Sequence, residues 1–339
     1  MADLCIAVER VLRSVIADLK SLVRIPSVSA DPARAGQVRA SAEVVSVKGG
    51  APAVIASWPA PDDASTVLLY AHHDAQPTSE PAQWSSEPFQ PTERQGRLYG
   101  RGVADDKAGV MAHIATLRAY NGRPPVGVTL FVEGEEEIGL VTRQAARIDY
   151  PESLYRAEAS VRESVKLVGS GSLAERLWTR PCISVLGLDA PRVAEAGNVL
   201  VPAARAKVSM RIGPGQHPGA ALDALTRHIQ SHAEFGAEVT VSDGLTGPPS
   251  KLDTTSPAFA VARQALTEAF GKAPVQIGIG GSIPSVAEFS AAFPDAAVLV
   301  IGTADPGARI HGPDEGLHLA QFAKVCLAQT LMLDRLARS

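Results

Sequence analysis

Hydrophobic residues close to the N-terminus recur every three or four positions, which is the spacing of one face of a helix. The repeat is formed by Leu4, Val8, Val11, Val15, Leu19 and Leu22. Pro26 and the serines that follow it end the pattern. The same spacing predicts helices over residues 217–233, 258–270 and 317–336, and a further helix that begins near Val110.

Three short apolar runs without helical spacing predict strands instead. They cover residues 65–70, 128–132 and 297–302 and are rich in β-branched side chains. Strands and helices alternate up to about residue 140, so we expect an α/β fold with a mostly parallel sheet flanked by helices. Catalytic groups in such open sheets lie at the carboxyl ends of the strands.

A second group of elements predicts a separate domain. Its strand patterns span residues 182–188, 203–212 and 238–242. A chain of 339 residues also exceeds the usual size of a single hydrophobic core. We therefore expect a main domain made of residues 1–150 and 246–339, and an inserted α+β lid domain made of residues 151–245.

The first predicted strand is followed at once by His72 and Asp74. A histidine that binds a metal uses one ring nitrogen, and the other nitrogen needs an acceptor to hold it. Asp74 is close enough in the sequence to be that acceptor. Taken alone, the pair is also typical of a surface histidine beside a loop aspartate.

A glycine-flanked turn delivers two adjacent carboxylates, Asp105 and Asp106, and then Lys107. One interpretation is a solvated turn whose aspartate caps the helix that follows. The other is a cation site. Both can hold, with Asp106 near the start of the helix and Asp105 free to face a cation.

The strand predicted over residues 128–132 also ends in acid, with four glutamates within positions 133–137. A solvated loop is the default for such a run, because like charges repel one another. A metal site is favoured because the same pattern is repeated: His311 also follows a predicted strand, the one over residues 297–302. A histidine, an aspartate, a glutamate and a second histidine form a mixed set that suits zinc, or manganese where carboxylates dominate. The other histidines are expected to be structural or exposed: His73, His113, His217, His228, His232 and His318.

These blocks, in this order, resemble the M20 family of dinuclear metallopeptidases, and most closely its dipeptidase branch of carnosinase-like enzymes. The resemblance covers residues 65–140 and 275–316. It implies hydrolysis of the peptide bond in dipeptides or small peptides. It also implies two divalent metal ions in the main domain, zinc foremost and manganese as the other choice.

Roles follow from the resemblance position by position. The implied metal ligands are His72, Asp105 as the bridging carboxylate, Glu137 and His311. Asp74 would orient His72. Glu136 would be the general base, which takes a proton from the metal-bridging water as it attacks the scissile carbonyl.

Two further matches concern the substrate. Gly280, Gly281 and Ser282 resemble the loop that cradles a terminal carboxylate, although a tight turn is the plainer interpretation. Arg211 resembles an arginine that clamps the same carboxylate from a neighbouring subunit, although an exposed strand arginine is common. The resemblance therefore implies a homodimer formed through the lid domain.

Composition excludes other classes of function. A net charge of −4 without a basic tract argues against a nucleic-acid partner. No apolar stretch approaches the roughly 20 residues that span a bilayer, and the N-terminus lacks a signal-peptide pattern, so we expect no membrane partner. The cysteines at 5, 182 and 326 are far apart and odd in number, which suits reduced thiols in a cytoplasmic protein.

Some features of the family are missing. No strand followed by an acid is visible between Leu140 and Leu167, where the family supplies another metal ligand, and its lid histidine is absent. The acids in that region are Asp149, Glu152, Glu158 and Glu163. One hypothesis is that internal segments are missing from the sequence near residues 43 and 140–165. The alternative is a naturally reduced protein that binds one metal ion or none. A non-catalytic ligand-binding relative that lacks the second metal ion therefore stays open. An N-acyl-amino-acid amidohydrolase is the other alternative, although the loop of Gly280, Gly281 and Ser282 points away from it.

Overall fold

The structure is a computed structural model. It describes residues 2–27, 53–61, 64–78, 81–133, 151–159, 161–178, 180–192, 194, 196–213, 216–242, 244, 252, 254–275 and 284–338. Statements below concern these residues. None of the helices among them is long and apolar enough to cross a membrane.

The central sheet contains β1 (Val54–Trp58), β2 (Thr66–His72) and β5 (Gly127–Glu133) in the order β1-β5-β2. Strands β2 and β5 are parallel and β1 is antiparallel to β5. The two predicted strands before residue 140 are therefore confirmed, as is the α/β class. Parallel pairing places His72 opposite Glu133, so the carboxyl ends of both strands meet at one edge of the sheet.

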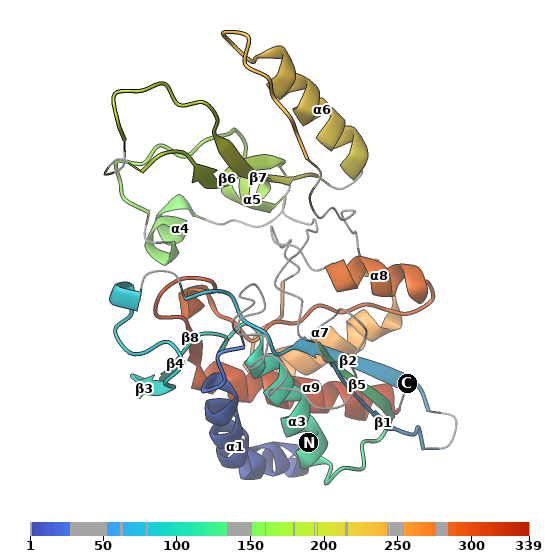
Figure 1. The fold of residues 1–339 in the computed structure, drawn as a ribbon. Coiled ribbons are helices and arrows are strands. Elements are labelled where there is room, and N and C mark those ends of the chain that lie inside the picture. The colour runs from blue at the N-terminus through green and yellow to red at the C-terminus, as the bar shows by residue number, and fades with distance from the viewer. Residues whose placement is uncertain are drawn as a thin grey trace.

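Helices pack beside this sheet (Figure 1). They are α1 (Ala2–Val23), α3 (Lys107–Ala119), α7 (Pro257–Phe270), α8 (Pro284–Ala292) and α9 (Leu319–Leu336). Val15 and Leu19 of α1 are fully buried together with Phe322 of α9. The apolar faces read from the sequence are thus the faces that form the core, and four predicted helices are confirmed within a few residues.

A small sheet joins two distant parts of the chain. It contains β3 (Thr92–Arg94), β4 (Arg97–Tyr99) and β8 (Gly316–His318), in the order β3-β4-β8. Leu98 lies opposite Leu317 in the antiparallel β4–β8 ladder. Short 3-10 helices η2 (Pro81–Gln83) and η4 (Pro306–Ala308) lie in the neighbouring loops. This pairing brings the turn after β4 beside the loop before β8.

The elements between residues 151 and 245 gather apart from α1, α3 and α9 (Figure 1). They are α4 (Glu152–Glu158), α5 (Leu173–Trp178), β6 (Cys182–Asp189), β7 (Arg205–Arg211) and α6 (Pro218–Ser231). Strands β6 and β7 pair antiparallel, with Cys182 opposite Arg211. The strands predicted over 182–188 and 203–212 and the helix predicted over 217–233 are confirmed. The exact domain boundaries stay predictions.

Two predicted strands are wrong. Residues 238–242 and 297–302 form no strand in the structure. In the first, Val239 and Val241 are half-buried in alternation with exposed neighbours, yet the segment joins no ladder. In the second, Leu299 packs against the cluster between α7 and α9, while Val300 and Ile301 are exposed. An apolar run can therefore be used for packing without strand pairing.

Candidate metal centre

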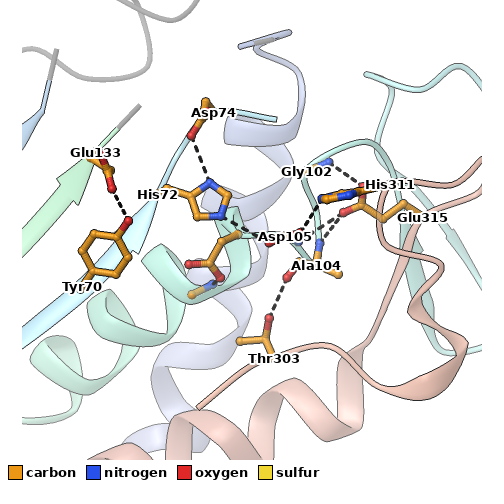
Figure 2. A network of polar contacts seen from close by, with 12 residues as sticks. Tyr70, His72, Asp74, Gly102, Ala104, Asp105, Glu133, Thr303, His311 and Glu315 are labelled. Carbon is orange, nitrogen blue, oxygen red and sulfur yellow. Dashed lines mark hydrogen bonds and ion pairs between the residues drawn. The ribbon is translucent and has the colours of Figure 1, made fainter. Parts of the chain in front are cut away.

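His72 is the last residue of β2, and its side chain is buried at the edge of the sheet. Its Nδ1 atom is 3.1 Å from Oδ1 of Asp74, which is fully buried (Figure 2). Burial disfavours a charged imidazole, but hydrogen bonds with Asp105 and Asp74 outweigh it, so the pKa of His72 lies well above its ordinary value. The contact expected between His72 and Asp74 is present.

Asp105 lies between two imidazoles that come from distant parts of the chain. Its Oδ1 atom is 3.3 Å from Nε2 of His72, and its Oδ2 atom is 3.1 Å from Nε2 of His311 (Figure 2). Burial acts to raise the pKa of Asp105, but the hydrogen bonds with His311 and His72 lower it below its usual range. Each oxygen of one carboxylate therefore faces a different histidine.

Asp106 caps α3, as one interpretation of the sequence expected. Its side chain accepts a hydrogen bond from the backbone N–H of Gly109 at 3.1 Å. Loss of hydration raises the pKa of this carboxyl to about 7. Asp105 contacts the two histidines, whereas Asp106 caps α3, so the two adjacent carboxylates have different roles.

Lys107 ties the same turn to the first helix. Its ammonium group donates to the backbone oxygens of Leu22 at 3.0 Å and Ile25 at 2.8 Å, just where α1 ends. The side chain is fully buried, and burial lowers the pKa of Lys107 to about 7. A cation at the carboxyl end of a helix also interacts favourably with the helix dipole.

One contact at the end of β5 was not predicted from the sequence. The hydroxyl of Tyr70 donates to Oε1 of Glu133 (Figure 2). The rings of Tyr70, Phe131 and Phe289 also pack together, which attaches α8 to this edge of the sheet. Glu133 is the last residue of β5 and the first acid of the run at positions 133–137. Parallel pairing of the strands predicted over 65–70 and 128–132 was the signal that could have placed it near Tyr70.

Several predicted site residues lie outside the described residues: Glu136, Glu137, Gly280, Gly281 and Ser282. Arg211 is described, and it is exposed at the last position of β7. Glu152, one of the acids between Leu140 and Leu167, lies on α4 and forms an ion pair with Arg156 at 2.6 Å. The described part of the centre thus consists of His72, Asp74, Asp105 and His311.

The donor set fits a divalent metal ion. Two imidazole nitrogens and a carboxylate are ligands that zinc takes in proteins, and the ring of His72 is already held through its other nitrogen. Among the described residues, no three histidine, cysteine or acidic side chains are arranged to hold an ion together. The two imidazoles instead contact the Asp105 carboxylate.

Comparison with known proteins decides the family. The model of peptidase family M20/M25/M40 matches residues 68–335. The chain belongs to this family. The resemblance inferred from the blocks of histidines and acids is therefore confirmed. Relatives named as dipeptidases agree with it, and the protein is a hydrolase that acts on peptide bonds.

Similar proteins include dipeptidases and, over shorter stretches, succinyl-diaminopimelate desuccinylases such as that of Verminephrobacter eiseniae, 38% identical over 91 residues, covering 24% of this chain and 23% of that protein. The cysteinylglycine-S-conjugate dipeptidase of Corynebacterium striatum is 26% identical over 368 residues, covering 80% of this chain and 81% of that protein. That alignment is longer than this 339-residue chain, so the relative has internal stretches without a counterpart here.

Two solved structures share the fold. Human carnosine dipeptidase 1 superposes with a TM-score of 0.84 at 19% identity, covering 99% of this chain and 98% of that one. The di-peptidase Dug1p of Saccharomyces cerevisiae superposes with a TM-score of 0.82 at 16% identity, covering 100% and 98%. At these identities the superpositions establish the fold alone.

Proposed function

We propose that the protein is a metal-dependent dipeptidase, which hydrolyses the peptide bond of dipeptides or small peptides. The observation that carries the proposal is the position of Asp105, which contacts both His72 and His311 through its two oxygens. A carboxylate that faces two imidazoles in this way has the donors for a shared metal centre. The dipeptidase names of the similar proteins support the class of substrate.

The proposed cofactors are two divalent metal ions, zinc foremost and manganese as the other choice. Their proposed ligands are His72, Asp105, Glu137 and His311. When bound, such ions lower the pKa of a water molecule and polarise a carbonyl group. The mixture of nitrogen and oxygen donors supports this assignment, because it suits zinc and tolerates manganese.

The chain's own residues would then perform the proton transfer and orient the substrate. Glu136 is the proposed general base that accepts the proton of the attacking water. Asp74 keeps the imidazole of His72 in one orientation, in agreement with their 3.1 Å contact. Arg211 and the loop of Gly280, Gly281 and Ser282 would hold the terminal carboxylate of the peptide, for which a guanidinium fork is well shaped.

A homodimer formed through the lid domain is part of the proposal. The side chains along β6 are all exposed, and they include Ile183 at 56%, Val185 at 66% and Leu188 at 69%. An apolar strand of this kind is stabilised when another chain covers it. Light scattering on the purified protein should give twice the mass of one chain, and Leu188→Lys should shift it towards the monomer.

A cytoplasmic location is also proposed. All three cysteines of the chain, Cys5, Cys182 and Cys326, are free in the structure. Free thiols persist in a reducing compartment. Labelling of unpaired thiols in freshly lysed cells should modify the exposed Cys182, whereas an oxidised Cys182 would contradict the location.

The test is dipeptide hydrolysis by metal-stripped protein titrated with zinc or manganese. Activity should appear near two ions per chain, and Glu136→Gln should reduce kcat by about 100-fold or more, because a general base contributes about 10²–10⁴-fold. Glu9→Gln is the matched control, since this acid is exposed on α1 and should leave the rate unchanged.

The alternatives give different results. Faster turnover of N-acetyl amino acids than of dipeptides would favour an N-acyl-amino-acid amidohydrolase. Tight peptide binding without hydrolysis at any metal concentration would favour a non-catalytic relative. Loss of activity in Glu9→Gln but not in Glu136→Gln would contradict the assignment of the general base.

A further inference from the structure

Glu315 is a buried carboxylate that the proposed reaction does not use. It lies four positions after His311, in the loop that leads into β8, and is 1% exposed. An ionised carboxylate is rarely buried unless each oxygen has strong hydrogen-bond donors. Its partners therefore indicate what this residue does.

The donors that the structure describes around the Glu315 side chain come from one segment, the turn that carries Asp105. The Oε2 atom accepts from Nη1 of Arg101 at 2.7 Å and from the backbone N–H of Gly102 at 3.1 Å. The Oε1 atom accepts from the backbone N–H groups of Ala104 at 2.9 Å and Asp105 at 3.3 Å (Figure 2). The carboxylate thus holds the backbone of the proposed metal ligand itself.

A second set of contacts fixes the loop around Glu315. Arg101 also donates from Nη2 to the backbone oxygen of Gly312, which lies in this loop, at 3.2 Å. The N–H of Gly100 donates to the backbone oxygen of Glu315 at 3.0 Å. Arg101 is as buried as Glu315 and lies 5.2 Å from the centre of the Trp84 ring. The turn and the loop are therefore also joined through the backbone oxygens of Gly312 and Glu315.

We propose that Glu315 is a positioning residue that sets Asp105 against His311 and thereby determines the affinity for the divalent metal ions. Glu315 acts through hydrogen bonds with the backbone of the turn that carries Asp105, and it is not proposed to contact the substrate. The proposal rests on the proposed function, because it takes Asp105 and His311 as metal ligands. A purely structural ion pair would stabilise the fold without affecting metal affinity at a given fraction folded.

The chain offers a matched control in the pair of Arg97 and Asp305. It also joins the β4 strand to the segment before β8, with Nη1 of Arg97 2.9 Å from Oδ2 of Asp305. It holds no backbone group of the turn that carries Asp105. Asp305→Asn should therefore cost stability without altering metal affinity.

The experiment compares zinc affinity, by competition with a chromophoric chelator, in the wild type, Glu315→Gln and Asp305→Asn. Glu315→Gln places an amide group before backbone donors and should weaken zinc binding by ~10- to 100-fold, the usual effect of losing a residue that supports a ligand. The zinc affinity of Asp305→Asn should stay within about threefold of the wild-type value. A tenfold change would correspond to ~1.4 kcal/mol. Thermal unfolding of each metal-free variant measures the structural contribution separately.

A double-mutant cycle with His311→Ala tests the mechanism. If Glu315 acts by setting Asp105 against His311, the loss caused by Glu315→Gln should shrink to within about threefold when His311 is already absent. An unchanged zinc affinity in Glu315→Gln overturns the proposal, as does an equal loss in both backgrounds. If Glu315→Gln does not fold, Glu315→Asp keeps the charge but shortens the reach, and wild-type affinity in that variant overturns the proposal too.

Failure of the proposed function gives a different signature. A wild-type protein that binds zinc but hydrolyses no dipeptide contradicts the function and leaves the role of Glu315 intact. Normal dipeptide hydrolysis with unaltered zinc affinity in Glu315→Gln contradicts only the role of Glu315. A wild type that binds no zinc contradicts both.

Discussion

The imidazole of His72 and the carboxylate of Asp74 face one another at 3.1 Å, although a single residue separates them in the chain. Side chains two positions apart in extended backbone point to the same side, so this geometry follows from the end of β2. A charged acceptor fixes the ring and makes its other nitrogen a better ligand. Both groups are buried, so water competes poorly for either.

Asp74→Asn should weaken zinc binding by ~10- to 100-fold, because an amide oxygen is a poorer acceptor than a carboxylate. Chelator competition measures the affinity. Asp18→Asn serves as control, since it removes the charge of a half-buried aspartate on α1 that pairs with Arg118 at 2.7 Å. An equal loss of affinity in both variants would attribute the effect to net charge.

Asp105→Asn should bring the pKa of His72 down in the metal-free protein. Burial alone would lower this pKa, and the hydrogen bond with Asp105 is the largest influence that raises it. Because the folded pKa lies above that of the unfolded chain, the pair stabilises the fold at low pH, and this stability is lost as pH rises through the folded pKa. NMR titration of the imidazole measures the change. A pKa of His72 that does not move would contradict this account of the site.

His113 should make the metal-free protein less stable in mild acid. Its Nε2 atom is 2.9 Å from the backbone oxygen of Tyr70 and its Nδ1 atom contacts Gln329. The imidazole is half-buried, and its loss of hydration lowers the pKa of His113 although both hydrogen bonds act to raise it. The unfolded chain therefore takes up a proton at a higher pH than the folded chain. Stability is fully present above a pH of about 6.5, the ordinary histidine value, and falls below it.

Urea unfolding at several pH values between neutral and mildly acidic measures this dependence. One proton contributes a slope of at most about 1.4 kcal/mol per pH unit. His113→Asn should flatten the curve, whereas His228→Asn, which changes an exposed histidine of α6, should keep it. Parallel curves for wild type and His113→Asn would rule out this assignment.

Leu317→Ala should lower the free energy of unfolding by about 2–5 kcal/mol, the usual range for a leucine removed from a core. Leu317 is fully buried opposite Leu98, which is buried equally. Chemical denaturation measures the loss. Leu186→Ala on the exposed strand β6 provides the comparison and should cost far less in a monomeric sample.

The sequence predicted much of the centre because its signals are local. The spacing of His72 and Asp74 lies within one strand end, and the capping role of Asp106 lies within the first turn of α3. Glu315 could not be found in this way. It stands in a polar loop, and its buried state depends on Arg101, which is 214 residues away in the sequence.

The wrong strands have a related cause. Period-two alternation at Val239 and Val241, or an apolar run such as 297–302, records which side chains avoid water. A strand also needs a neighbour to accept its backbone hydrogen bonds, and that neighbour is set by the tertiary fold. Residue patterns therefore indicated burial at Leu299 correctly but not the form of the backbone.

The contact between His311 and Asp105 joins positions 206 residues apart. A ribosome makes the chain from its N-terminal end, so Asp105 emerges long before its partner, and every element from α4 to α8 is translated in between. Asp105 therefore has no contact with His311 while the intervening region is being synthesised. Nascent chains released before residue 311 would contain His72 but not His311, so the proposed capacity to bind a metal ion would arise only late in synthesis.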